Sequence, residues 1–329
     1  MKKILVTGVG GGVGQSILKA LQETYYGLVG VDADELAAGL HAVETAYKGL
    51  YATDPNFVDR LLEICRVEGC NIIFPGLDFE LAPLAANVAR FQSEGVTPIV
   101  SSQDVIRICD DKLATHDFLK AHGFPVPRTH RLKDITSIHY PVVIKPQRGG
   151  SRSSNTYLIR SAAEFDVYKP LVDPENCIVQ EYLDGDEYTC GTVTLDGRCR
   201  GVIVMRRTLR AGDTYKAFVE RNKNIESMVS EIVEVLKPFG ACNVQLRIIN
   251  DVPVVFEINA RCSGTTAARA LAGFNEPRMI ADHLLANIEP TYSIREIGVL
   301  RYWQELVVTN KRIQILGETG HLVGDGNKL

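Results

Sequence analysis

The segment NVQLRIINDVPVVFEINARCSGTT, residues 243–266, is the stretch from which the fold is predicted. Its residues 244–249 and 252–258 are rich in β-branched side chains, which favour strands. Asn250 and Asp251 stand between these two runs, and both residue types are strong turn formers. The segment therefore predicts a β-hairpin.

One end of this hairpin carries several oxygen-bearing side chains. Side chains alternate between the two faces of a strand, so Glu257 and Asn259 lie on the same face. A three-residue loop would place Gln245 opposite Glu257, although the pattern alone leaves the register open. With Arg261 just beyond the strand, these hard oxygen ligands suit Mg²⁺ and phosphate rather than zinc or a haem iron. The alternative is a plain hairpin end with a solvated glutamate and an asparagine turn.

The composition is that of an ordinary globular protein. The 329 residues are 45% hydrophobic and 23% charged, and the formal net charge is −4. The sequence has no block of like charge and no apolar run of 18 residues, so we expect no nucleic-acid partner and no membrane span. The eight cysteines have no CxxC pair and no Cys/His ligand spacing, which predicts reduced thiols and a cytoplasmic location.

Residues 1–105 alternate strand and helix patterns, which predicts a doubly wound parallel sheet. The loop TGVGGGVG, residues 7–14, misses the pattern GxGxxG but fits the TGxxxGxG pattern of short-chain dehydrogenases. Asp32 ends the second strand, where an acidic residue could meet a ribose. The other interpretation of this loop is a tight strand-to-helix turn.

Two acidic residues follow one of the predicted strands. Asp78 and Glu80 follow the strand at 71–74, the usual place for ligand contacts in such sheets, although helix capping explains Asp78 equally well.

Residues 104–122 are interpreted as one helix with Lys112 near its middle, and the Pro-rich stretch at 124–127 marks a domain boundary.

The order of signals over residues 105–290 resembles the ATP-grasp superfamily, and most of all the large subunit of carbamoyl phosphate synthetase and its single-unit relatives. The signals, in order, are Lys112, VVIKP at 142–146, a glycine and serine loop, VQEYLDGDEY at 179–188, a helix, NVQ at 243–245 and FEINARCSG at 256–264. The resemblance implies a pre-ATP-grasp domain over 1–105 and an ATP-grasp domain over 106–290, with a lid at about 125–183. It also implies that residues 291–329 are a C-terminal extension packing on the ATP-grasp domain.

The resemblance assigns the nucleotide and the metal to particular residues. Those that would bind ATP are Lys112 and Lys145 on the α- and β-phosphates, Gly149, Gly150 and Ser151 over the phosphates, Gln180, Glu181, Tyr182 and Leu183 around adenine, and Glu187 on the ribose. Those that would hold Mg²⁺ are Gln245, Glu257 and Asn259.

The implied reaction is activation of a small carboxylate by ATP and Mg²⁺. The γ-phosphoryl group moves to a carboxylate oxygen, and an amine attacks the acyl phosphate to give an amide. Lys145, Asn259 and Arg261 are the catalytic residues of this scheme, with Arg261 on the transferred group. Arg206, Arg207 and Arg210 are candidates to hold a carboxylate of the acceptor, or else they form a solvated basic loop. The expected partners are a small-molecule carboxylate and an amine, with amino acids first, and the resemblance admits a homodimer.

Three other functions are weighed against this one. A carbamoyl phosphate synthetase-like enzyme would phosphorylate carbonate or carbamate, but the full synthetase carries two such units and this chain has one. An NAD(P)-dependent oxidoreductase of the short-chain type would need a tyrosine with a lysine four residues later, and no tyrosine has that partner. A non-catalytic nucleotide-binding protein would not need Glu257 and Asn259.

Overall fold

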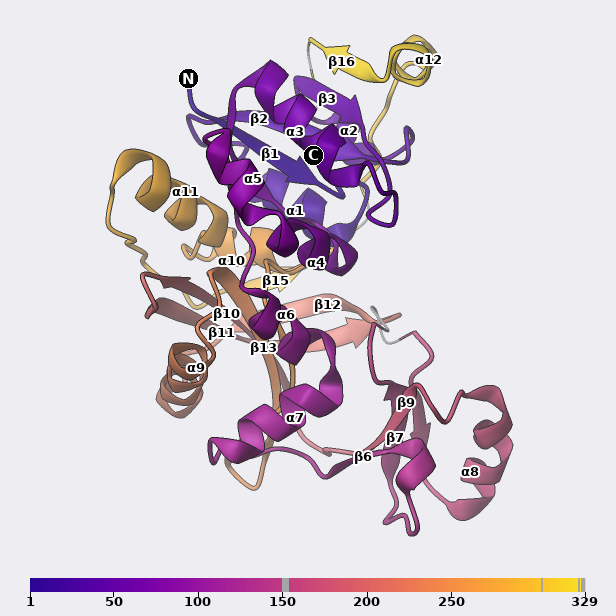
Figure 1. Ribbon diagram of the computed structural model, residues 1–329. Coiled ribbons are helices and arrows are strands. Elements are labelled where there is room, and N and C mark those ends of the chain that lie inside the picture. The colour runs from indigo at the N-terminus through magenta and orange to yellow at the C-terminus, as the bar shows by residue number, and fades with distance from the viewer. Residues whose placement is uncertain (150–153, 303, 325, 327–328) are drawn as a thin grey trace.

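The computed structural model describes residues 1–149, 154–302, 304–324, 326 and 329 of the chain. These residues form three β-sheets, which Figure 1 shows one after another, from the N-terminal part at the top to the strands β6, β7 and β9 at the lower right. Helices lie between and beside the sheets. In the part of the chain that the structure covers, no helix is both long enough and apolar enough to cross a lipid bilayer.

The N-terminal sheet is parallel, with one antiparallel strand added at an edge. Its order is β16-β3-β2-β1-β4-β5. Its strands are β1 (Lys3–Thr7), β2 (Gly27–Asp32), β3 (Thr45–Lys48), β4 (Cys70–Phe74), β5 (Thr97–Pro98) and β16 (His321–Val323). The helices α1 (Gly12–Leu21) and α2 (Ala38–His41) cover one face, and α3 (Phe57–Glu68), α4 (Asp78–Ala86) and α5 (Val88–Ser93) cover the other.

Apolar side chains along β1 alternate between the two faces of the sheet, which explains why helices cover both faces. Ile4 and Val6 pack with α1, whereas Leu5 between them packs with α3. A strand that is buried on both faces needs apolar side chains on both, and β1 has them in Ile4, Leu5 and Val6. The predicted doubly wound parallel sheet is therefore confirmed.

The middle of the chain forms two antiparallel sheets. The larger, of order β14-β13-β10-β11-β12-β15, consists of β10 (Glu187–Leu195), β11 (Arg198–Arg210), β12 (Asp213–Val219), β13 (Gly240–Ile249), β14 (Val252–Asn259) and β15 (Gly298–Leu300). The smaller, of order β6-β9-β7-β8, consists of β6 (Thr129–Arg131), β7 (Val142–Pro146), β8 (Tyr157–Ile159) and β9 (Cys177–Glu181), with α8 (Ala162–Tyr168) beside it.

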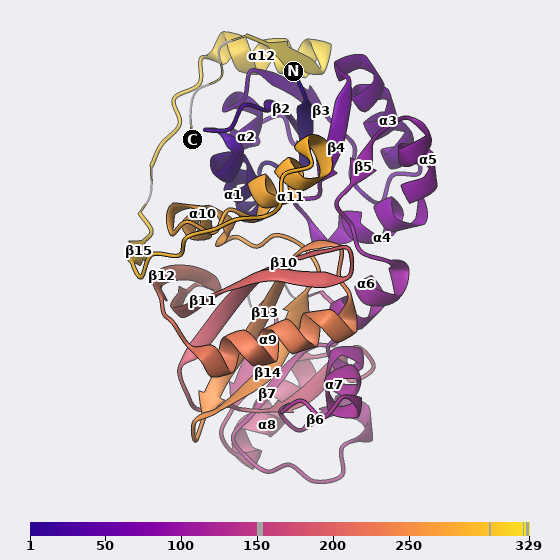
Figure 2. The same cartoon turned by 90° about the vertical axis from the view of Figure 1, so that its left-hand side faces the viewer.

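Helices cover the larger sheet and join it to the N-terminal part. Figure 2 shows α9 (Lys223–Leu236) lying across this sheet, where Ile225, Val229 and Ile232 are fully buried at helical spacing. The helices α10 (Thr266–Leu271) and α11 (Glu276–Ala286) contact α1, so they connect the larger sheet to the N-terminal part.

The predicted hairpin is confirmed, but its loop is shorter than the three residues considered. Asn250 and Asp251 alone form the turn, and both have positive φ values of 48° and 65°, as a type I′ turn requires. A bulge at Phe256 then shifts the register by one residue. Gln245 lies opposite Glu257 because of this bulge and not because of the loop length.

The prediction of one helix over 104–122 is wrong. The helices α6 (Gln103–Asp110) and α7 (Lys112–Ala121) are separated at Asp111, whose backbone is extended. The Asp111 carboxylate caps α7 by accepting hydrogen bonds from the backbone N–H groups of Leu113 and Ala114. Lys112 consequently lies at the first position of a helix and not near the middle of one.

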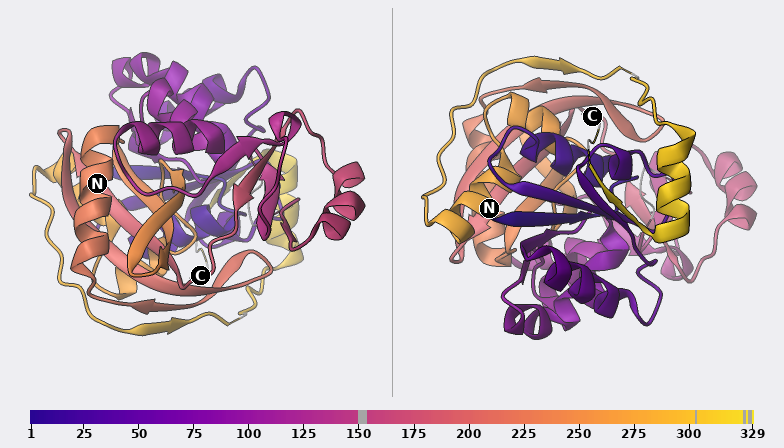
Figure 3. Two further views of the ribbon diagram at one scale, coloured as in Figure 1. Left: turned by 90° about the horizontal axis from the view of Figure 1, so that it is seen from below. Right: turned by 90° about the horizontal axis from the view of Figure 1, so that it is seen from above.

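The C-terminal residues divide between two sheets. The strand β15 pairs with β12 at the edge of the larger sheet, whereas β16 pairs with β3 in the N-terminal sheet. The helix α12 (Asn310–Thr319) precedes β16, and Leu316 and Leu322 are buried there. Figure 3 shows the segment leading to α12 running along the outside of the molecule. The prediction that residues 291–329 pack on the ATP-grasp domain is therefore wrong for α12 and β16. These elements pack on the N-terminal sheet because the open edge of β3 offers backbone hydrogen-bond partners and an apolar surface.

Candidate active site

The side chains at the end of the hairpin form one connected group. Glu257 Oε1 accepts hydrogen bonds from Asn259 Nδ2 at 3.0 Å and from Gln245 Nε2 at 3.3 Å. Burial would raise the pKa of Glu257, but the positive charges of Lys112 and Lys145 outweigh it and hold that pKa below its usual value. Glu257 is thus an anion facing two lysines.

This donor set fits a magnesium ion. One carboxylate and two amide oxygens are hard ligands, and Mg²⁺ is usually held by one or two protein carboxylates together with phosphate oxygens. Among the described residues, no three His, Cys, Asp or Glu side chains gather closely enough to form a metal cage of their own. The arrangement therefore suits a cation that shares its ligands with a bound phosphate rather than a closed structural site.

The two predicted phosphate-binding lysines come from a helix and a strand, Lys112 from the start of α7 and Lys145 from β7, and both act on the charge of Glu257. Lys145 on β7 is only 7% exposed, and its ammonium lies 5.6 Å from the centre of the Phe256 ring. Burial lowers the pKa of Lys145 to about 8, although Glu257 acts in the opposite direction. Lys112 Nζ donates to the carbonyl oxygen of Gly149 at 2.7 Å. The other two loop residues predicted to cover the phosphates, Gly150 and Ser151, lie outside the described residues.

The predicted adenine segment lies where the smaller sheet leads into the larger one. Gln180 is buried and donates from Nε2 to Thr129 Oγ1 at 3.0 Å. The Glu181 carboxylate accepts from Arg128, with Nε to Oε2 at 3.1 Å. Leu183 is buried and Tyr182 donates its backbone N–H to the carbonyl oxygen of Pro141. These contacts fix the segment, while its role toward adenine stays a prediction.

Glu187, predicted to bind a ribose, is held by two arginines. Its Oε1 accepts from Arg207 Nε at 2.9 Å and its Oε2 from Arg247 Nη2 at 2.8 Å. Arg207 Nη2 also donates to Gln245 Oε1 at 2.7 Å. A continuous chain of polar contacts thus runs from Glu187 through Arg207 and Gln245 to Glu257.

Of the three arginines predicted to hold an acceptor, the structure brings only Arg207 to this group. Arg206 is its neighbour along β11 and faces the other side, where Nε donates to Glu220 at 2.6 Å. Arg210 lies over the ring of Tyr215, with 5.2 Å between the guanidinium carbon and the ring centre. The structure thus turns Arg206 and Arg210 toward other partners, and their role toward an acceptor stays a prediction.

Arg261 is joined to the N-terminal part of the chain. Its Nε and Nη2 donate to the two carboxylate oxygens of Asp78 at 2.8 and 2.9 Å, and Nη2 lies 3.4 Å from Asn259 Oδ1. Burial would raise the pKa of Asp78, but Arg261 lowers it below its usual value. Asp78 therefore lies at the site through its contact with Arg261. Its position after a strand suggested such a contact, although helix capping explained an aspartate there equally well.

The glycine loop near the N-terminus is hydrogen-bonded to a side chain of the protein itself, the carboxylate of Asp32. Asp32 accepts hydrogen bonds from the backbone N–H groups of Gly10 at 2.7 Å and Asp34 at 3.0 Å. A side chain at Gly14 would collide with the backbone of Gly8, so the loop is tightly packed. Both observations support the interpretation of this loop as a strand-to-helix turn.

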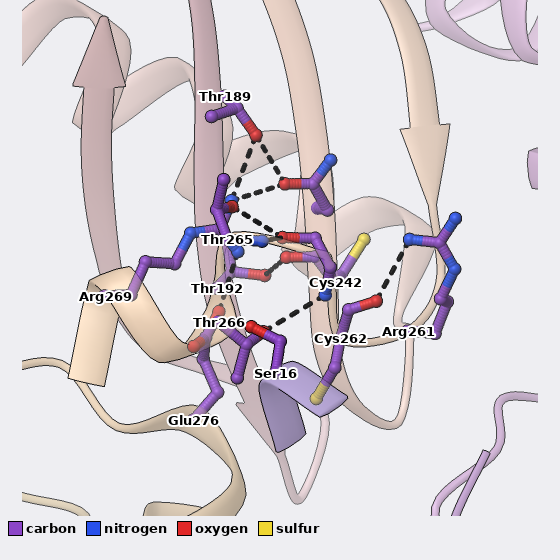
Figure 4. A network of polar contacts seen from close by, with 12 residues as sticks. Ser16, Thr189, Thr192, Cys242, Arg261, Cys262, Thr265, Thr266, Arg269 and Glu276 are labelled. Carbon is purple, nitrogen blue, oxygen red and sulfur yellow. Dashed lines mark hydrogen bonds and ion pairs between the residues drawn. The ribbon is translucent and has the colours of Figure 1, made fainter. Parts of the chain in front are cut away.

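A buried polar network supports the hairpin from behind (Figure 4). Arg269 and Glu276 are both fully buried, and Arg269 Nη1 donates to Glu276 at 2.8 Å. Arg269 Nη2 donates to Thr189 and to Asn243, which lies opposite Asn259. This network was not predictable from the sequence, because its members come from four elements far apart in the chain.

Two family models match different parts of the chain. The family model described as "ATP-grasp in the biosynthetic pathway with Ter operon" matches residues 173–304, and that of the PylC-like N-terminal domain matches residues 4–99. A D-alanine–D-alanine ligase of Francisella philomiragia is 28% identical over 153 residues, which are 45% of this chain and 50% of the relative. The match therefore spans half the length of that ligase.

Two further relatives cover more of the chain. The carbamoyl phosphate synthase large chain of Pseudothermotoga lettingae is 24% identical over 302 residues, which are 80% of this chain and 26% of that protein. The crystal structure of the L-amino acid ligase from Bacillus licheniformis has a TM-score of 0.67 and 16% identity, over 91% of this chain and 79% of that one. The fold and the predicted resemblance are confirmed: the chain belongs to the ATP-grasp superfamily, with a PylC-like N-terminal domain followed by an ATP-grasp domain.

Proposed function

We propose that the chain is an ATP- and Mg²⁺-dependent ligase that joins a small carboxylate to an amine through an acyl phosphate. The observation that carries this proposal is the meeting of Lys112 and Lys145 with the ionised Glu257, at a strand end that also bears Asn259 and Gln245. Buried cations beside hard oxygen ligands suit a triphosphate and its metal ion. A protein that only bound a nucleoside would not need this arrangement.

Each residue has a role that its position supports. Glu257, Asn259 and Gln245 would hold Mg²⁺, which neutralises charge on the β- and γ-phosphates when it is bound. Lys145 and Lys112 would neutralise further phosphate charge. Arg261, which Asp78 holds by two hydrogen bonds, would stabilise the oxygens of the group in transfer.

Amino acids are the first substrates to test. Both a D-alanine–D-alanine ligase and an L-amino acid ligase are among the proteins that this chain resembles. In such a reaction no protein side chain forms a covalent intermediate, so catalysis rests on positioning and on charge neutralisation. We also retain the predictions of a homodimer and of a cytoplasmic location.

The proposal is tested by phosphate release from Mg·ATP in the presence of amino acids, singly and in pairs, with bicarbonate included. Mass spectrometry of the productive mixtures then identifies the new amide. We expect release that depends on both a carboxylate and an amine, and that is lost in Glu257→Gln. Tight ADP binding with no stimulated release by any pair would instead indicate a nucleotide sensor, and oxidation of NAD(P)H would indicate the oxidoreductase.

A further inference from the structure

The chain passes from the smaller sheet to the larger one through a linking segment, residues 182–186, which is neither helix nor strand. Strand β9 ends at Glu181 before it, and β10 begins at Glu187 after it. Figure 1 shows the smaller sheet standing beside the larger sheet, so the linking segment joins two distinct parts of the fold. A segment without helix or strand hydrogen bonds needs other contacts to fix its backbone.

Backbone hydrogen bonds hold the two ends of the linking segment. At its start, the N–H of Tyr182 donates to the carbonyl oxygen of Pro141 at 3.2 Å. At its end, the carbonyl oxygen of Asp186 accepts from the N–H of Ile248 on β13 at 3.2 Å. The segment lies directly against β13 there, because a Cβ atom added at Gly185 would lie 2.1 Å from the carbonyl oxygen of Ile248. The middle of the segment is held by a side chain instead.

Arg247 on β13 reaches the middle of the linking segment with its guanidinium group. Its Nη1 donates to the carbonyl oxygen of Leu183 at 2.7 Å, and its Nη2 donates to Glu187 Oε2 at 2.8 Å. The guanidinium carbon also lies 5.4 Å from the centre of the Tyr182 ring, within the range of a cation–π contact. A single planar group thus contacts two residues of the segment and the first residue of β10.

The strand pairing places Arg247 where these contacts are possible. Arg247 lies directly opposite Glu187 in the pairing of β10 with β13, and it shares a face of β13 with Gln245. The side chain of Arg247 is 24% exposed and that of Glu187 is 11% exposed, so both are mostly shielded from water. Glu187 also accepts from Arg207. Loss of Arg247 alone therefore leaves Glu187 paired, and its main effect falls on the linking segment.

We propose that Arg247 is a positioning residue that holds the linking segment in the shape needed to bind the base of the nucleotide. This inference rests on the proposed function, in which residues 180–183 surround adenine. A loose segment would have to become ordered when the base binds, and the entropy lost in that step would weaken binding. Arg247 orders the segment beforehand. The phosphates would bind at Lys112 and Lys145, which lie on other elements and make no use of this contact.

The experiment separates the base from the phosphates by comparing Mg·ADP with Mg·tripolyphosphate in calorimetric titrations. Arg247→Met should raise the Kd for ADP about tenfold, as expected for loss of a charged hydrogen bond, and leave the Kd for tripolyphosphate unchanged. Arg247→Lys keeps the charge but lacks the planar fork, so its Kd for ADP should lie between those of wild type and Arg247→Met. Gly185→Ala forces the same segment away from β13 and should have the same selective effect.

The matched control is Arg200→Met, because Arg200 makes contacts of the same kind at the other end of β10. Its Nε donates to the carbonyl oxygen of Leu195 at 3.4 Å, and its Nη2 donates to the Asp196 carboxylate at 2.8 Å. Its side chain is 23% exposed, close to the value for Arg247. Arg200→Met should change neither Kd, since it loses comparable contacts away from the linking segment.

Hydrogen exchange in the ligand-free protein tests the positioning role without any nucleotide. The amide groups of residues 182–186 should exchange faster in Arg247→Met than in wild type. Unchanged exchange, or an unchanged Kd for ADP, would overturn the inference and leave the ligase function standing. An equal loss of ADP and tripolyphosphate binding would also overturn it, because it would indicate a general loss of structure. Failure of the wild-type chain to bind ADP would overturn the proposed function together with this inference.

Discussion

Asp78 and Arg261, 183 residues apart in the sequence, form an ion pair with two parallel hydrogen bonds of 2.8 and 2.9 Å. Asp78 is the first residue of α4 in the N-terminal domain, and Arg261 follows the strand that carries Glu257 and Asn259. The pair links the two domains at the point where we place the transferred group. Two-point pairing fixes the plane of a guanidinium as well as its position.

Replacing Asp78 by asparagine should therefore impair turnover. Asparagine keeps the size of the side chain but cannot accept two charged hydrogen bonds, so Arg261 loses its fixed orientation. We expect kcat to fall by about tenfold with the affinity for ADP unchanged, because misplacement of one charge-stabilising group is costly. Asp59→Asn is the control, since Asp59 pairs with Arg90 on the surface. Equal kcat values for wild type and Asp78→Asn would contradict this role for the pair.

Glu257→Gln tests the metal assignment. The substitution keeps the shape of the side chain and removes its charge, so turnover should fall by at least about 10²–10³, while ADP still binds in the absence of Mg²⁺. Titration with Mg²⁺ should no longer tighten ADP binding in this variant. Glu220→Gln, in the half-exposed ion pair with Arg206 beside the same sheet, should behave like wild type. Near-normal turnover of Glu257→Gln would remove Glu257 from the metal site.

Nucleotide affinity should fall as the pH rises above 8. Burial lowers the pKa of Lys145 to about 8, so the free protein loses this positive charge as the pH rises through that value. Bound phosphates favour the charged form, and binding above pH 8 must then take up a proton. The affinity for ADP should drop by up to about tenfold per pH unit between 8 and 9. Lys145→Arg keeps its charge throughout and should show a flat profile in the same calorimetric titrations.

Glu80 should make the stability of the N-terminal domain depend on pH. Its carboxylate accepts from Thr7 Oγ1 at 2.6 Å and from the N–H groups of Gly76 and Leu77, and burial raises its pKa from 4.5 to about 7. Between these two values the unfolded chain loses the proton and the folded chain keeps it. The free energy of unfolding should therefore fall by about 1.4 kcal/mol per pH unit in this window.

Urea unfolding of wild type and Glu80→Gln at pH 5, 6 and 7 measures this effect. Glutamine cannot ionise, so the difference in unfolding free energy between the two proteins should shift in favour of the variant as the pH rises. A difference that is constant across the three pH values would show that Glu80 is already ionised at pH 5 in the folded chain.

The buried pair of Arg269 and Glu276 should stabilise the fold only when both partners are present. Arg269→Met leaves Glu276 buried without its counter-charge, and we expect a loss of about 3–5 kcal/mol in the free energy of unfolding. Adding Glu276→Leu to that variant should restore most of the loss, because an apolar pair replaces an uncompensated charge. A double variant that is less stable than Arg269→Met alone would mean that Glu276 contributes independently of Arg269.

The fold class was predictable because local patterns carry it. The β-branched runs around Asn250 and Asp251 predicted the hairpin, and the apolar strands of residues 1–105 predicted the doubly wound sheet. The break at Asp111 was not predictable from periodicity. Its carboxylate also accepts a hydrogen bond from Gln147 at 2.7 Å, so a contact from the smaller sheet helps to fix it.

The site was predictable only where its residues lie in one local motif. Glu257, Asn259 and Gln245 come together as the hairpin predicts, although the bulge that aligns them has no clear local signal. The position of Asp78 after β4 suggested a ligand contact, but its pairing with Arg261 from a distant part of the chain was not predictable from the neighbouring residues. Nor could the sequence alone distinguish Arg207 from Arg206, because that choice depends on which face of the sheet is turned toward the site.

The pairing of β16 with β3 also has a consequence for how the protein acquires its structure. The first sheet of the chain is completed by β16, which begins 273 residues after β3 ends (321 − 48), so this contact is one of very long range. Contacts of such long range form slowly. During synthesis the edge of β3 stays open until β16 has emerged, so a nascent chain is exposed to association through that edge while residues 49–320 are made.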